Sequence, residues 1–469
     1  MRDASVWRLT LRTALPRLSR GHVRIALLLL SVLAGLSVAD FSVFAQTPAD
    51  VLTLDRAIDI AVAFNRPMKM SRIEEQRAVD DIAALRTRRW PAFDLRTMSG
   101  GFLTPLQFSF SQGAFGTFPA TGPIPFADVS IDSPRQLSTA VLFTAVQPIT
   151  QLRKISQGET LLKLGAAVAA VQTDKRRQEL IADVRRVYYG LHQAGAGLVA
   201  TREALTQLEE LDRVVTGYVE SGVALPRDRL SVRTERAKAM SELLRHGHLQ
   251  ATLSERLNLL LGRDLATPFV VTELPAAAMD DRDLEGAVAR AKAAHPSVRE
   301  ADLNVQRAAQ DLRLKAMDRM PDVGVSFTYI RLLNVAVLPQ TVAAASLVLS
   351  WEPFDWGRRR DETSARGRTL EQARIGSQEA QAIVELNVRA KFRAVLEAQE
   401  ALAVAQLARQ TAAEEVRVMT DRYRAEAALL KDVLAAQTAT AMAMLAHQQA
   451  LGTFWTARAE LDQAVGELP

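Results

Sequence analysis

Asp228 and Asp432 are the two side chains whose positions point most clearly to a charged functional site. Asp228 lies six residues after Gly222, and Asp432 lies nine residues after Tyr423, so both follow a break between long helical segments. If several such hairpins converge, their carboxylates form a ring, and a carboxylate ring in a narrow pore favours cations. The alternative is an ordinary helix N-terminus, where capping and the helix dipole favour an acidic side chain.

No other set of polar residues predicts catalysis, a metal site or a cofactor site. The sequence has no phosphate-binding loop, nucleotide fingerprint or zinc-ligand spacing. His246 and His248 stand two apart on a predicted helix, so they point in different directions, and we interpret them as solvated surface residues. We interpret Gly190, Gly195 and Gly197 as packing or bending points of a helix. The chain is therefore predicted not to be an enzyme and to use no cofactor.

The net charge of +5 comes mostly from the start of the 469-residue chain. Residues 1–45 hold six of the 58 basic and two of the 53 acidic residues, which leaves 52 basic against 51 acidic residues in the remainder. A nucleic-acid partner is therefore not expected, because the electrostatic basis for binding one is missing.

Residues 1–45 have the pattern of a secretory signal peptide. A basic stretch ends at Arg24, the apolar run Ile25–Val38 follows, and Val43-Phe44-Ala45 supplies small residues for a cleavage site. An uncleaved anchor is the alternative. The chain has no cysteine, so packing rather than disulfides must stabilise it. For the same reason it cannot carry a lipid on an N-terminal cysteine.

The predicted helices and strands that position the two aspartates occur as two copies of one pattern. Leu54, Ala57, Ala61, Trp90-Pro91 and Phe93 recur about 230 positions later as Leu284, Ala287, Ala291, Met320-Pro321 and Val323. Each copy predicts a short helix, a second helix, a strand, a loop, a strand, a very long helix and a return helix, and such a duplication defines the folding unit. The predicted domains are a signal peptide at 1–45, a first repeat at 46–262, a linker at 263–283 and a second repeat at 284–469.

The long helices are the strongest local prediction. Gln151 to about Thr216 contains no proline, Gly357–Tyr423 is its counterpart, and a helix of roughly 65 residues spans on the order of 100 Å. Apolar residues keep a three-four spacing along both segments, which predicts a partner helix along the length. The return helices are predicted at about Arg227–Leu261 and Lys431–Leu461.

Each repeat also holds two segments that alternate in polarity. They are Phe93–Met98, Ser138–Val146, Asp322–Ile330 and Ser346–Trp351, and the long segment Gly101–Arg135 separates the first two. Four short strands need closed edges, and the aromatic residues Trp90, Phe93, Tyr329 and Trp351 among their flanks are typical of a membrane-spanning β-barrel at its interfaces. A small soluble sheet with a packed aromatic core is the alternative.

The order of these features resembles the TolC family of bacterial outer-membrane efflux proteins over about Thr53–Leu468. The resemblance is carried by Asn65-Arg66-Pro67, His295-Pro296, Pro91, Pro321, Gln147-Pro148-Ile149, Leu257 through Gly262, Trp351 through Arg358, and Tyr423 through Leu434. The order of these matches, which occurs in both repeats, is specific.

The resemblance implies a mainly α protein with membrane β structure. Duplicated long helical hairpins form an α-barrel across the periplasm, and four strands per subunit enter a twelve-stranded β-barrel of a homotrimer in outer-membrane lipid. Such proteins are passive exit ducts for efflux or type I secretion, opened by a periplasmic adaptor and an inner-membrane pump. Tyr423 and Asp432 match gate positions, but the family's second aspartate is Ala435 here, its glycine is Glu426 and its arginine is Ala428.

A periplasmic coiled-coil structural or adaptor protein is the competing interpretation. An adaptor needs a contiguous β-rich domain, whereas the predicted strands are divided between the two repeats.

Overall fold

The computed structural model describes residues 50–101, 107–132, 137–222, 225–275, 283–335, 339–425 and 427–467. The predicted signal peptide, residues 1–45, lies outside them. The chain divides into two units, of which the larger comprises Leu52–Thr267 and Val271–Pro469 and holds the helices and the main sheet. In the smaller unit the described residues are 50–51 and 268–270. These residues form most of the short strand pair β1 (Asp50–Leu52) and β8 (Phe269–Val271), which sequence analysis did not predict.

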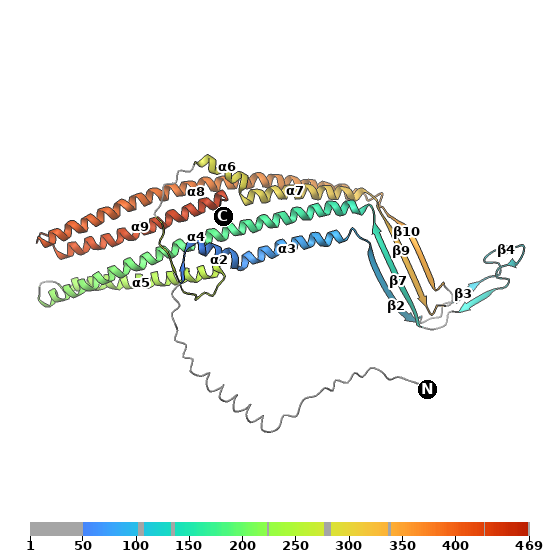
Figure 1. Cartoon of the computed structure of the whole chain (residues 1–469), viewed down its shortest axis with the longest axis horizontal. Helices are drawn as coiled ribbons and strands as arrows, with labels where there is room; N and C mark the ends of the chain where they lie inside the picture. The colour runs from blue at the N-terminus through green and yellow to red at the C-terminus, as the bar shows by residue number, and fades with distance from the viewer. Residues whose placement is uncertain are drawn as a thin grey trace, which may run out of the picture. The chain divides into compact units, whose positions relative to one another are not determined.

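The larger unit contains the predicted repeat (Figure 1). The first copy consists of α2 (Leu54–Phe64), α3 (Arg66–Thr87), β2 (Ala92–Gly101), β7 (Leu137–Pro148), α4 (Gln151–Glu220) and α5 (Pro226–Leu261). The second consists of α6 (Leu284–Ala294), α7 (Pro296–Ala316), the 3-10 turn η1 (Met317–Arg319), β9 (Asp322–Leu333), β10 (Thr341–Ser350), α8 (Arg358–Arg424) and α9 (Leu430–Val465). The same order of helices and strands therefore occurs twice.

The short helices of the two copies are broken in the same way. Asn65 ends α2 and caps α3 by accepting a 3.1 Å hydrogen bond from the Met68 N–H. His295 ends α6 and caps α7 through Nδ1, which accepts from the Ser297 N–H at 3.1 Å. A proline at the start of each second helix fits there because that N–H has no helical partner.

The return helices α5 and α9 end against these breaks. Gly262 and Gly466 follow them in the left-handed region, with φ of 71° and 83°. The Asn65 amide donates to the Leu260 carbonyl at 2.9 Å, so the end of α5 is bonded to the break between α2 and α3. Each long hairpin is thus joined to the short helices of its own repeat.

The predicted seam of α8 packs against α9. Val388, Val395, Ala398 and Leu402 are buried in one cluster with Leu451, Phe454, Ala457 and Leu461. In the other repeat α4 packs against α5, and α4 also contacts α7 and α9, which joins the two copies. Among the described residues, no helix is long and apolar enough to cross a membrane.

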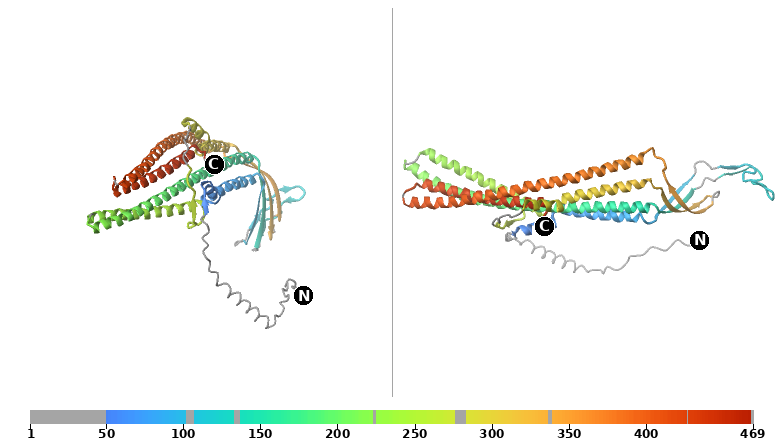
Figure 2. Two further views of the ribbon diagram at one scale, coloured as in Figure 1. Left: turned by 60° about the vertical axis from the view of Figure 1, so that its left-hand side comes forward. Right: turned by 90° about the horizontal axis from the view of Figure 1, so that it is seen from above.

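The main sheet has four antiparallel strands in the order β10–β9–β7–β2. It extends from the ends of the helices that lie opposite the hairpin tips (Figures 1 and 2). Strand β10 is longer than predicted because the run Ala343–Ala345 has no alternation to reveal it, and the link from β9 is correspondingly shorter. Strands β2 and β10 are the two edges of this sheet.

The long segment between β2 and β7 contains short strands. Within described residues 107–132, β3 (Gln107–Phe110) pairs with β6 (Val129–Asp132). Nested between them, β4 (Thr117–Phe118) pairs with β5 (Gly122–Pro123). The frequent Gly and Pro residues masked these short strands, because both residue types are depleted in strands.

Candidate pore and membrane sites

The register of the sheet gathers apolar side chains on one face. Because side chains alternate along a strand, residues that face each other in the register share a face. This face carries Phe93, Leu95, Val141, Phe143, Val325, Phe327, Tyr329, Leu347 and Leu349. The Phe93 and Phe143 rings stack with centroids 6.1 Å apart, and Phe327 meets Phe143 edge-on at 6.4 Å.

The opposite face of the same sheet is more polar. Arg96 and Asp94 form an ion pair there at 2.7 Å between Nε and Oδ1. The hydroxyls of Ser326 and Ser346 lie 3.2 Å apart on the β9–β10 pair. The sheet is thus a wall with an apolar face and a polar face, the pattern of a membrane barrel strand.

The four predicted interface aromatics occupy two kinds of position. Phe93 and Tyr329 lie on the apolar face, where Phe93 is exposed and Tyr329 is half-buried beside Phe143. Trp90 and Trp351 lie at the end of the sheet where strands join helices, and both are exposed. Every residue of the edge strands β2 and β10 is exposed, so these strands have no buried aromatic core.

The two predicted tip aspartates occupy equivalent positions in the repeat. Asp228 is the third residue of α5, and its carboxylate accepts from the Leu225 N–H at 3.2 Å. Asp432 is the third residue of α9 and accepts from the Leu429 N–H at 3.1 Å. Both therefore cap helix N-termini, and the shared Leu-x-x-Asp spacing was the sequence signal of this equivalence.

Asp432 also lies beside a hollow, in addition to capping its helix. It lines an open hollow of about 530 Å³ between the ends of α8 and α9, together with Glu415 and Arg422. Ala428 and Ala435, which stand where the resemblance expects an arginine and a second aspartate, line the same hollow. Tyr423 lies in the last turn of α8, and its side chain is outside the described part of the chain.

An ionic cluster that the sequence did not predict lies where α3 and α4 adjoin the sheet. Glu159 of α4 has a side chain only 7% exposed, and it meets Arg86 at 2.9 Å and Lys163 at 2.8 Å. Arg89 donates to its second oxygen. Hydrogen bonds from Lys163 and Arg86 lower the pKa of Glu159 to about 2. The sequence could have indicated the pair of Glu159 with Lys163, which are four residues apart on one helix. It could not indicate the two arginines, which precede Glu159 by about 70 residues.

Replacing Glu159 with glutamine is expected to loosen the junction of α3 and α4, because three cations lose their shared carboxylate. The thermal midpoint measured by circular dichroism should fall by several degrees. Since the pKa falls from 4.5 to about 2 on folding, this stabilisation is complete above pH 4.5 and is lost as the pH falls toward 2. The difference between the two proteins should shrink over that range.

The matched control is Glu210→Gln, which removes an exposed ion pair with Arg213 in the same helix. It should change the midpoint little, because exposed pairs contribute little. Equal effects of the two substitutions would show that the buried cluster has no special role.

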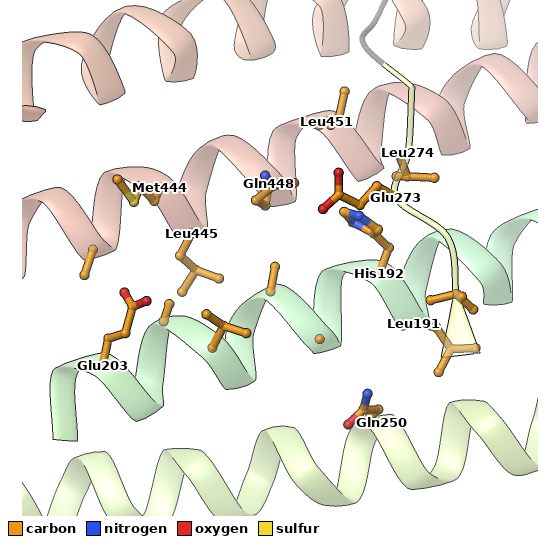
Figure 3. A pocket seen from close by; sticks show the side chains of 16 residues that line it. Leu191, His192, Glu203, Gln250, Glu273, Leu274, Met444, Leu445, Gln448 and Leu451 are labelled. Carbon is orange, nitrogen blue, oxygen red and sulfur yellow. The ribbon is translucent and has the colours of Figure 1, made fainter. Parts of the chain in front are cut away.

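A further pocket of about 500 Å³ lies between α4, α9 and the segment after β8. His192 lies beside Glu273 at its wall, with Leu191, Leu274 and Leu451 nearby (Figure 3). Burial lowers the pKa of His192 against the opposing effect of the Glu273 charge, so its imidazole is mostly neutral at pH 7. The lining offers no nucleophile paired with a base.

The interpretation of His246 as a surface residue was wrong. This side chain is 9% exposed, because its ring packs on Gly197, where a Cβ atom would lie 2.8 Å from it. Gly197 is thus a packing point between α4 and α5, as interpreted from the sequence. Among the described residues, no three His, Asp or Glu side chains are arranged to hold a metal ion.

Comparisons with known proteins identify a family match and a shared fold. Residues 287–467 match the sequence profile of the family described as outer membrane efflux protein. No curated protein sequence matches the chain. The outer-membrane channel OprN has a TM-score of 0.70 at 15% identity, covering 88% of this chain and 90% of that chain.

Two further channel structures give the same result. The CmeC outer membrane channel of Campylobacter jejuni has a TM-score of 0.72 at 13% identity, covering 88% of this chain and 85% of that one. The MtrE outer membrane channel of Neisseria gonorrhoeae has a TM-score of 0.66 at 15% identity, covering 88% of each chain. The predicted fold class and the resemblance are therefore confirmed.

Proposed function

We propose that this chain, an outer membrane efflux protein by the match of its second repeat and by its fold, is a passive exit duct. It is the outer-membrane channel of a tripartite efflux or type I secretion system. The observation that carries this proposal is the four-stranded sheet, which has one apolar exposed face and one polar face, and whose two edges have no further strand partner among the described residues. The adaptor alternative is not supported, because the main sheet combines strands of both repeats.

Three copies close the barrel in this proposal. The unpaired edge of β2 meets the unpaired edge of β10 in the next subunit, which gives twelve strands and leaves no edge. The apolar face, with Phe93 and Tyr329, contacts outer-membrane lipid, and Trp90 and Trp351 lie at the interface. The polar face, with Asp94 and Arg96, lines the lumen.

The helical hairpins extend into the periplasm in this proposal, and their tips meet the partners. A periplasmic adaptor and an inner-membrane pump open the duct there. Asp228, Asp432 and Tyr423 form the gate, with the aspartates as carboxylate rings at the narrow end. The signal peptide at 1–45 directs export. The structural units are the repeats at 46–262 and 284–469, joined by the linker at 263–283.

The proposal is tested by purifying the mature chain from membranes in detergent and measuring its mass and its single-channel conductance. A trimer with small, cation-selective currents in planar bilayers is expected, because three subunits close the barrel and the tips carry carboxylates. A monomer without currents would overturn the proposal, because the strands would then close no barrel.

A further inference from the structure

The four junctions between strands and helices lie at one level of the sheet. The register pairs Ala92 with Val146, Pro148 with Gly324, and Asp322 with Ser350. The segments that enter β2 and β9 and those that leave β7 and β10 therefore meet at the same end of the sheet (Figure 1). Residues within one or two turns of these junctions form a band directly below the strands.

Basic side chains in this band fall into two groups. Six of them are paired with carboxylates: Arg86 and Arg89 with Glu159, Lys154 with Asp322, Lys315 with Asp318 and Glu362, and Arg358 and Arg359 with Glu352. These pairs hold the junctions together. Asp355 also pairs with Arg359, and the exposed Asp361 follows Arg360 in the first turn of α8.

Four arginines of the band are not paired. Arg88 ends α3, Arg153 lies in the first turn of α4, Arg319 ends η1, and Arg360 lies in the first turn of α8. All four are exposed, and none has a carboxylate within ion-pair distance in the part of the chain that the structure describes. One such arginine precedes or follows each strand of the sheet, so their charges surround its end.

Aromatic side chains accompany these charges. Trp356 is 90% exposed and has a left-handed backbone, φ 58°, which is costly for a bulky residue. The Asp355 carboxylate holds this turn by accepting from the N–H groups of Gly357 and Arg359, each at 3.1 Å. The exposed Phe354 ring meets Trp356 edge-on at 4.8 Å between centroids. The chain therefore uses a strained turn to present an aromatic pair to the surroundings.

We propose that this band is a phospholipid-binding collar, formed by Arg88, Arg153, Arg319 and Arg360 together with Phe354 and Trp356. The occupant is the headgroup phosphate of phospholipids in the periplasmic leaflet of the outer membrane. The inference rests on the proposed function, which places the sheet in that membrane. It adds a specific ligand chemistry and residues that the barrel itself does not require.

Three observations favour a lipid phosphate as the occupant. The guanidinium group presents paired donors that match phosphate oxygens. Tryptophan and phenylalanine beside those charges suit the boundary between headgroups and acyl chains. The exposed residues Trp90 and Trp351 lie between the collar residues and the strands β2 and β10 in the sequence.

The test compares a collar variant, R88Q/R153Q/R319Q/R360Q, with a control variant, R202Q/R256Q/R307Q/R393Q. The control arginines are also exposed and lack an ion-pair partner in the described residues, but they lie on the helices away from the junctions. Each protein is purified in detergent with added phosphatidylglycerol, and retained lipid is counted by native mass spectrometry. The wild-type protein is also tested with diacylglycerol, which has the same chains but no phosphate.

The wild-type and control proteins should retain several-fold more phosphatidylglycerol than the collar variant. The wild-type protein should also retain phosphatidylglycerol several-fold better than diacylglycerol. Equal retention by collar and control variants, or equal retention of the two lipids, would overturn the collar. If the collar variant does not assemble, the comparison of the two lipids on the wild-type protein still tests whether the bound lipid needs a phosphate.

Failure of the collar and failure of the proposed function give different results. A protein that forms trimers and conducts ions, but binds the two lipids equally, keeps its function as a channel and loses the collar. A monomer without currents contradicts the channel itself.

Discussion

Replacing Gly262 with alanine is expected to be among the most destabilising single changes in the helical part of the chain. A Cβ atom at this position would lie 2.4 Å from the carbonyl oxygen of Phe64, and the backbone has φ of 71°. The oxygen belongs to the main chain at the end of α2, so it cannot rotate away as a side chain can. Strain at such a position together with the forced shift costs about 3 kcal/mol.

Two other glycines give a graded comparison. At Gly466 the equivalent Cβ atom would lie 3.2 Å from the Cα atom of His295, with φ of 83°, so a smaller loss is expected. Gly247 lies inside α5 with no atom within 4 Å of its Cβ position, and alanine there should stabilise the helix by about 0.5–1 kcal/mol.

The measurement is thermal unfolding in detergent, followed by helical circular dichroism at equal protein concentration. The midpoints should follow the order G247A, wild type, G466A, G262A from highest to lowest. A midpoint for G262A equal to that of G247A would show that the end of α5 does not need its close contact with the break between α2 and α3.

The parts of the fold that could be predicted from the sequence are those with a regular spacing of apolar residues. The segment that forms α4 has no proline for about 65 residues and keeps one apolar seam, so both its existence and its partner were evident. The actual helix ends at Glu220, because helix ends depend on contacts and caps rather than on periodicity. Strand β10 was underestimated for a related reason, since Ala343–Ala345 carries no alternating pattern.

The positions of the candidate residues were predictable only where they depend on the neighbouring sequence. Trp90 and Trp351 flank strands in the sequence, and the structure leaves both exposed at the end of the sheet. The burial of Glu159 depends on arginines about 70 residues away, and that of His246 depends on Gly197 in another helix. Contacts between residues so far apart in the chain produce no spacing pattern that could be recognised in a single sequence.

Neutralising both tip aspartates is expected to have the largest effect on ion conduction. Each chain carries Asp228 and Asp432 near its two hairpin tips, so the proposed trimer would bring six carboxylates to the proposed gate. In the double variant D228N/D432N, block of the current by divalent cations should weaken by on the order of tenfold, which corresponds to about 1.4 kcal/mol. The measurement is single-channel current in planar bilayers over a series of Mg²⁺ concentrations.

The capping role of the same carboxylates requires that charge and cap be separated. An asparagine oxygen can still accept from the Leu225 and Leu429 N–H groups, so D228N/D432N removes the charge and keeps the cap. The variant D228E/D432E keeps the charge, and glutamate is itself a favoured residue at this helical position. The variant D228A/D432A removes both charge and cap.

These three variants distinguish a gate from a helix terminus. If the carboxylates form the proposed rings, the asparagine and alanine variants share weakened divalent block and the glutamate variant retains it. If the aspartates act only as caps, the asparagine variant conducts like the wild type, and the alanine variant differs only in its thermal midpoint. Because Ala428 and Ala435 are uncharged, α9 supplies no second carboxylate to the hollow, and the other charged residues that line it are Glu415 and Arg422 of α8.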